Sequence, residues 1–160
     1  VGDLASIRGI SERTRLTKTQ CEDLLKCADS MDLAVEPDAR MTGQNYRWDE
    51  VVSVFPREDE LNLHDKSYHA ASILLRLGMS VAAADGNIDE SEVSTITMHL
   101  EQRFQLTPHA SVRLEHLSHV LSRQPSDDTR IAKQIQHFPI DQREVIGEFL
   151  IAVAAADEIV

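Results

Sequence analysis

An apolar stripe at helical spacing runs into an acidic turn at residues 82–92, and this feature constrains the fold most strongly. Apolar residues recur every three to four positions on both sides of the turn, which predicts two amphipathic helices. Gly86 permits the left-handed backbone that ends a helix. Asp89 followed by Glu92 has capping-box spacing and predicts the start of the next helix. The stripe residues are Tyr68, Ala71, Leu74, Leu75, Gly78, Val81 and Ala82 before the turn and Val93, Ile96, Leu100 and Phe104 after it.

Further helices are expected on both sides of this pair. Thr17 and Gln20 have capping-box spacing and predict a helix over residues 18–31. Thr107, with Pro108 in the first turn, predicts another helix after the acidic pair. Prolines and polar residues break the remaining chain. The later segments are a break at Pro125, a short helix around Ile131 and Ile135, a stop at Pro139 and a last helix that starts at Asp141 and Glu144.

The chain before this bundle has a different pattern. Residues 1–15 lack sustained periodicity, so we expect little structure there. Residues 33–55 combine turn formers with β-branched residues and predict an extended hairpin or arm, in which Trp48 and Phe55 are packing anchors. The expected fold is therefore mainly α. A helix and a short arm in an N-terminal region, residues 1–62, precede a helical domain over residues 63–160.

The helical domain contains an internal repeat. Residues 154–157 repeat the sequence of residues 82–85, which predicts a bundle with two pseudo-repeated halves. In the second copy Glu158 stands where the glycine is expected, and Val160 comes before any further acids. The chain also begins without methionine, so we expect a piece of a longer protein, cut at the C-terminal end of this domain.

Composition limits the classes of partner. There are 16 basic and 27 acidic residues, a formal charge of -11, which disfavours nucleic acid and favours cations or basic protein partners. Cys21 and Cys27 lie on different faces of one helix and suit neither a disulfide nor a zinc site, so we expect a reducing, cytoplasmic location. The apolar run 145–156 is too short to span a membrane and contains Glu148.

The acidic turn is the candidate metal site. Asp85, Asn87 and Asp89 offer oxygens at alternate positions, as the start of a calcium loop does. The EF-hand pattern itself fails, because its glycine falls on Glu90 and its last glutamate falls on Ile96. Two interpretations stay open: a divalent-cation site, or helix capping alone.

These residues resemble the TerB-like family of tellurite-resistance proteins. The motif is an Ala-Asp-Gly turn followed by an aliphatic residue and a glutamate, here Asp85, Gly86, Ile88 and Glu92, and the resemblance covers about residues 63–160. It implies a helical domain in which the acidic turns of the two halves lie near each other and bind a metal ion. The positions that match this implied site are Asp85, Asp89, Glu92 and Asp157.

The resemblance implies a non-enzymatic stress-response domain that binds a divalent cation, a protein partner, or both. Oxygen ligands favour calcium, magnesium or manganese over zinc. The alternatives are a metal-free helical interaction module and, with less support, a metal-dependent hydrolase. His116 and His119 lie three apart on one helix, but a zinc site there lacks a third ligand. Trp48 is a candidate anchor for a protein partner, although aromatic residues also pack internally.

Overall fold

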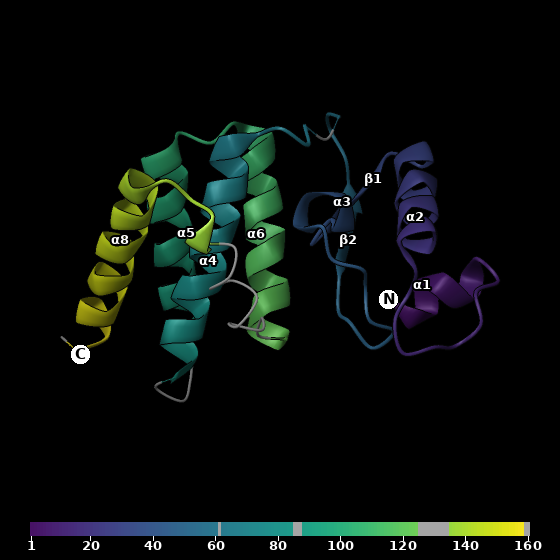
Figure 1. Cartoon of the computed structure of the whole chain (residues 1–160), viewed down its shortest axis with the longest axis horizontal. Coiled ribbons are helices and arrows are strands. Elements are labelled where there is room, and N and C mark those ends of the chain that lie inside the picture. Colours follow the sequence, from purple (N-terminus) through teal and green to yellow (C-terminus); the bar gives the residue numbers. More distant parts are fainter. Residues whose placement is uncertain (61, 85–87, 125–134, 159–160) are drawn as a thin grey trace. The chain divides into compact units, whose positions relative to one another are not determined.

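Helices make up most of the structure, as the sequence predicts. The computed structural model describes residues 1–60, 62–84, 88–124 and 135–158, with no side-chain description for residues 84, 142, 150 and 152–158. Contacts divide the chain into an N-terminal unit, Val1–Asp65, and a helical unit, Lys66–Val160. Figure 1 shows the elements of each unit.

Helix α4 is the central element of the helical unit. It spans Lys66–Ala84 and packs against the other described helices of the unit. Gly78 faces both α5 and α8: a β-carbon there would lie 3.5 Å from Ile96 of α5 and 3.5 Å from Phe149 of α8. The small size of the residue at position 78 therefore leaves room for two helices against α4, and a larger side chain than a methyl group would not fit. The partners of α4 are α5 (Glu90–Phe104), α6 (Pro108–Arg123) and α8 (Ile140–Glu158).

The predicted stripes form the core of this unit. The apolar residues of α4 are largely buried, and Ile96 and Leu100 of α5 are buried beside them. Thr107 caps α6, and Pro108 occupies its first turn. Extended structure in the described chain is confined to the residues before Leu63, as predicted. The predicted break at Pro125 and the helix around Ile131 lie outside the described residues.

Helices α4 and α8 run in the same direction. They pack against each other, and in Figure 1 both descend to the lower end of the bundle. The last described turns of the two helices therefore lie at the same end of the helical unit. These turns carry the two copies of the sequence repeat.

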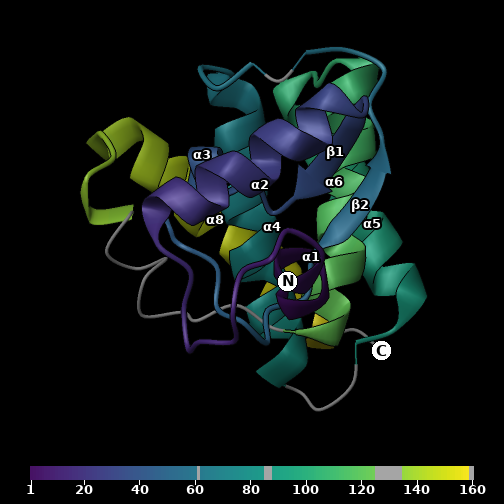
Figure 2. The ribbon, with the colours of Figure 1, turned by 90° about the vertical axis from the view of Figure 1, so that its right-hand side faces the viewer.

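The N-terminal unit combines helices with a small antiparallel sheet. Leu33 pairs with Pro56 and Glu36 pairs with Ser53, so the predicted antiparallel pairing is confirmed, whereas the helix between the two strands, Ala39–Thr42, was not predicted. Helix α2 begins at its capping box, as predicted, and lies against β1 in both views (Figures 1 and 2). The elements are α1 (Gly2–Ile7), α2 (Lys18–Ser30), β1 (Leu33–Glu36), α3 (Ala39–Thr42) and β2 (Ser53–Pro56).

The start of the chain is more ordered than we expected. The prediction of little structure in residues 1–15 is wrong for Gly2–Ile7, which form α1. A helix of this length is not stable by itself, so tertiary contacts must hold it. Ala5 is fully buried, and the amide of Gly2 donates a hydrogen bond to the carbonyl oxygen of Trp48 at 2.8 Å.

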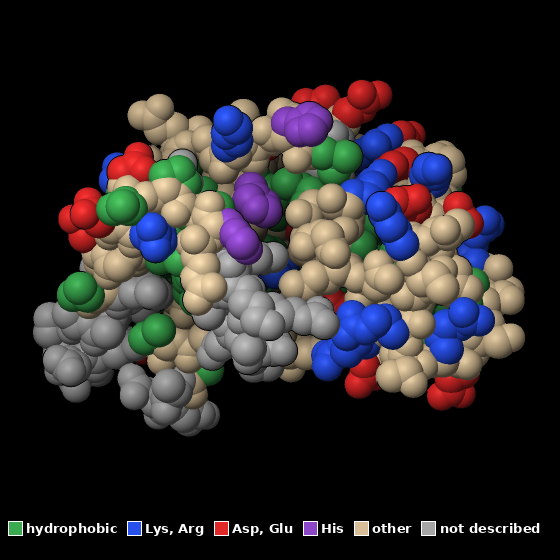
Figure 3. All heavy atoms as spheres, viewed as in Figure 1, with side chains coloured by type: hydrophobic (Ala, Val, Ile, Leu, Met, Phe, Trp, Pro, Cys, Tyr) green, Lys and Arg blue, Asp and Glu red, His purple; other side chains and the backbone are tan. Residues whose placement is uncertain are grey.

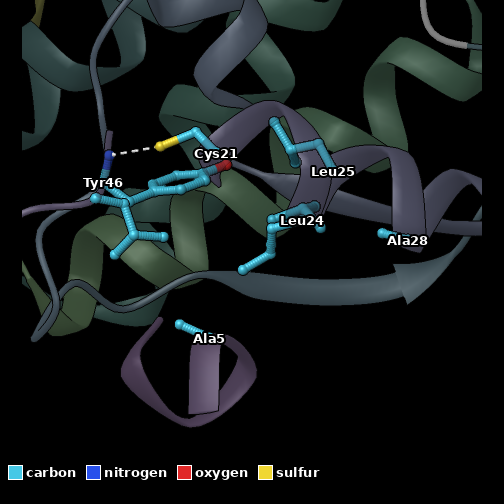
Figure 4. Packing of buried hydrophobic residues seen from close by; sticks show 8 residues of the cluster. Ala5, Cys21, Leu24, Leu25, Ala28 and Tyr46 are labelled. Atoms are coloured by element: carbon cyan, nitrogen blue, oxygen red, sulfur yellow. Dashed lines mark hydrogen bonds between the residues drawn. The ribbon is translucent and has the colours of Figure 1, made fainter. Parts of the chain in front are cut away.

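One cluster of buried side chains holds the N-terminal unit together. The cluster includes Leu24, Leu25 and Ala28 of α2 (Figure 4). The buried ring of Tyr46, from the loop between the strands, packs in the same cluster. The amide of Tyr46 donates a hydrogen bond to the sulfur of Cys21 at 3.4 Å. Burial raises the pKa of the Cys21 thiol, which therefore stays protonated at neutral pH. Cys21 and Cys27 are both free thiols.

Candidate functional site

The first turn of α5 holds the described part of the acidic turn. Asp89 is the N-cap residue, and its carboxylate accepts hydrogen bonds from the amide of Ser91 at 3.2 Å and from the hydroxyl of Ser91 at 3.0 Å. Glu92 accepts a hydrogen bond from the amide of Asp89 at 3.1 Å. The predicted capping box is therefore present, and it brings the carboxylate of Glu92 to the backbone of Asp89.

Capping does not use all the lone pairs of the Asp89 carboxylate. A carboxylate has about four lone-pair sites, so the bonds from Ser91 do not saturate Asp89. Asp89 is exposed to solvent, and Glu90 adds a further charge to the same helix turn. The N-terminus of a helix stabilises such negative charges by itself, which is the simplest reason for their presence.

The structure brings together only part of the predicted ligand set. Asp89 and Glu92 are neighbours, whereas Asp85 and Asn87 lie outside the described residues. The backbone of Asp157 lies in the last turn of α8, but its side chain is not described. Helices α4 and α8 end at the same end of the bundle (Figure 1), so residues 82–84 and 154–157 of the repeat are located there.

Within the described ranges, no three His, Cys, Asp or Glu side chains are grouped so that they could hold a metal ion. This applies to the histidines of α6 as well. His119 lies 4.0 Å from the carboxylate of Glu115, which is one turn away on the same exposed face. The neighbouring His116 is partly buried, and this burial lowers its pKa. Neither His116 nor His119 needs a bound metal ion to explain its place on the helix.

Comparison with family models decides the class of the helical unit. The model described as "Tellurite resistance protein TerB" matches residues 71–160. The chain belongs to the TerB family. The match covers α4 from Ala71 onward together with α5, α6 and α8, so it coincides with the helical unit and includes the acidic turn. We call this unit the TerB domain. Comparisons with curated proteins and with solved structures gave no match.

The N-terminal unit lies outside the family match and contains Trp48, the predicted partner-binding residue. Trp48 is half-buried, and its indole packs over Gly2: a β-carbon there would lie only 2.4 Å from the indole Nε1 atom. Its amide donates a hydrogen bond to the carbonyl oxygen of Thr14 at 3.1 Å. Trp48 thus has a packing role, and its use as a partner anchor stays a prediction.

Sequence reasoning missed an ionic network in the N-terminal unit. The guanidinium of Arg40 contacts Asp29 at 2.6 Å and Asp38 at 2.8 Å, and the guanidinium of Arg57 contacts Asp29 at 3.4 Å. The hydrogen bonds that Arg40 donates to Asp38 and to Asp29 raise the pKa of its guanidinium, although burial lowers it. The local signal was Asp38, which caps α3 through the amide of Arg40. Its link to Asp29 depends on tertiary contacts and has no sequence signature.

No described helix is both long and apolar enough to cross a membrane.

Proposed function

We propose that the TerB domain is a non-enzymatic, cytoplasmic stress-response module that binds a divalent cation at the acidic turn between α4 and α5. The ligands would be Asp85, Asn87, Asp89, Glu92 and, from the end of α8, Asp157. The observation that carries this proposal is the capping box of α5, which holds Asp89 and Glu92 together while Asp89 keeps lone pairs available.

The chemistry of these residues favours a hard cation. Neighbouring carboxylates repel one another, and a divalent ion relieves this repulsion while it binds several oxygens at once. The set contains carboxylate and amide oxygens but no thiolate or imidazole, so calcium, magnesium or manganese is favoured over zinc. The parallel arrangement of α4 and α8 supports the inclusion of Asp157, because both helices end at the same end of the domain.

Titration calorimetry of the whole chain with calcium, magnesium, manganese and zinc tests the proposal. At about 100-fold excess over its dissociation constant, an ion that binds only the folded form stabilises it by roughly 2.7 kcal/mol. The melting temperature should therefore rise with at least one of the first three ions. The double variant Asp85→Asn and Asp89→Asn should lose this rise but remain folded, since asparagine also caps helices well.

Two matched variants separate the charge from the cap. Glu92→Gln keeps the capping-box hydrogen bond and removes one charge, so it should weaken ion binding without loss of stability in the ion-free protein. Asp141→Asn makes the same kind of change at the start of α8 and should leave ion binding unaltered. No heat with any ion, and equal melting with and without ions, would contradict the cation site.

A metal-free interaction module is the second candidate. It is supported by the same capping box, because helix capping by itself explains Asp89 and Glu92. On this interpretation the acidic surface recruits a basic protein partner. A metal-dependent hydrolase has less support, since catalysis would need an open coordination position and a substrate pocket next to the ion.

A further inference from the structure

A cavity of about 590 Å³ lies in the N-terminal unit between α2 and α3. Ala39 of α3 and Leu63 from the segment before α4 contribute apolar surface to it, while Leu25 of α2 also lines it but is buried. Leu63 is exposed although it is apolar, and the charged side chains of Lys18 and Lys26 stand in solvent at the edge. The cavity is therefore an open groove with apolar walls and a charged rim.

The rim carries positive charge in a unit that is acidic. Lys18 and Lys26 are the lysines of this unit, in which acidic residues outnumber basic ones. On the face shown in Figure 3, the basic side chains of the N-terminal unit lie among acidic ones. Arg40 also lines the groove, but Asp29 and Asp38 neutralise it. The cations that remain for a ligand are the two lysines.

Helix geometry fixes the spacing of these charges. Lys18, Glu22 and Lys26 are four residues apart and lie on one face of α2, with the two lysines about 12 Å apart along the axis. Glu22 stands between them, with its carboxylate 4.0 Å from the ammonium of Lys18. Such an exposed pair is weak, so Lys18 can exchange it for a ligand carboxylate. The rim thus presents a positive, negative, positive pattern.

We propose that this groove binds an extended acidic segment of a partner protein, with two carboxylates on Lys18 and Lys26 and an apolar side chain against Ala39 and Leu63. In an extended chain, residues i and i+4 are about 13 Å apart, which matches the lysine spacing. Residues i, i+2 and i+4 also point to the same side. A glutamate, leucine, glutamate pattern at these positions therefore fits the rim charges and the apolar walls together.

Glu22 should determine which acidic sequences the groove prefers. A partner with an acidic residue at the central position would place that carboxylate opposite Glu22, whereas a leucine avoids this repulsion. The groove should therefore prefer the alternating pattern over a continuous acidic run. Binding should also weaken with salt, because the rim charges are exposed to solvent.

The probe is a short peptide in which two glutamates are four residues apart and a leucine lies midway between them. It is titrated into the ¹⁵N-labelled whole chain and followed by two-dimensional amide NMR. The amide signals of residues 18–26 and 39–45 should shift and saturate, while those of the TerB domain stay in place. No shift at roughly millimolar peptide, or shifts elsewhere on the chain, would overturn the proposal.

Charge variants test the rim. Lys18→Gln with Lys26→Gln should weaken peptide binding by about 2- to 30-fold, the range for two exposed ion pairs. Arg8→Gln with Arg47→Gln removes the same charge from exposed positions outside the groove and should leave binding unchanged. Glu22→Gln should tighten binding. Equal weakening by the two double variants would indicate general charge attraction and contradict a groove.

Apolar variants test the walls. Leu63→Ala should weaken binding, whereas Ile7→Ala, at an exposed aliphatic residue outside the groove, should not. Both side chains are exposed, so neither change threatens folding. A control peptide with serine in place of leucine should bind more weakly to the unmodified chain. Equal binding of the two peptides would indicate an anion site alone, and the proposal of a peptide groove would fail.

Discussion

The amide of Gly2 donates a hydrogen bond to the carbonyl oxygen of Trp48 at 2.8 Å, and the indole of Trp48 packs over the same glycine. This contact joins α1 to the loop before β2, at the edge of the cluster that contains Ala5 and Tyr46. Trp48 is the tryptophan of the chain, so its fluorescence reports on the N-terminal unit.

Gly2→Ala should destabilise the N-terminal unit. The added methyl group would lie 2.4 Å from the indole Nε1 atom, so the ring or the helix must move, and overpacking of this kind costs about 1–3 kcal/mol. Urea unfolding followed by Trp48 fluorescence measures the change. An unchanged midpoint would show that the indole does not rest on Gly2 in solution.

Gly78→Ala should stabilise the protein, in contrast to Gly2→Ala. Its nearest neighbours, Ile96 and Phe149, would lie 3.5 Å from the new methyl group, which is ordinary contact. Alanine favours helix over glycine by up to about 1 kcal/mol, so the TerB domain should gain stability. The change in melting temperature is measured by thermal unfolding, with circular dichroism as the signal. Gly78→Leu is the matched control, because its larger side chain should separate the helices and lower the melting temperature.

Asp89→Ala should destabilise the TerB domain in ion-free buffer by about 0.5–2 kcal/mol, because the amides at the start of α5 lose their acceptor. Asp89→Asn should cost much less, since asparagine caps as well as aspartate. Chemical unfolding in the presence of a chelator compares the two. Equal losses would show that the charge, rather than the hydrogen bond, stabilises this turn.

The N-terminal unit should lose stability at alkaline pH. Burial raises the pKa of Tyr46, and the nearby charge of Asp38 raises it further. The unfolded chain then releases the phenol proton at lower pH than the folded chain does. This contribution to stability is complete below about pH 10 and falls as the pH rises above it.

Tyr46→Phe should flatten this part of the pH profile. The variant also loses the bond from the amide of Ala39 at 3.1 Å and the bond to the carbonyl of Pro37 at 2.5 Å, so its stability at neutral pH should be lower. Urea midpoints by Trp48 fluorescence, from about pH 8 to about pH 11, measure both effects. Tyr68→Phe, in the TerB domain, should leave the profile of the N-terminal unit unchanged. An equal alkaline slope with and without Tyr46 would contradict the assignment.

The starts of α2, α5 and α6 were determined by the sequence itself. Capping-box spacing at Thr17 and at Asp89, and the Thr107-Pro108 pair, each satisfy backbone amides within one turn, so neighbouring residues contain all the information needed. The apolar stripes and the acidic motif of the TerB domain can also be recognised from residues that lie close together in the sequence.

Helix α1, the ion pairs of Arg40 and the groove between α2 and α3 were decided by tertiary structure alone. Helix α1 is too short to form by itself and depends on Trp48 and the buried cluster. The bonds of Arg40 to Asp29 and the groove between α2 and α3 join residues that are far apart in sequence. Such contacts form only when folding overcomes the entropy cost of bringing distant segments together, and no local spacing records them.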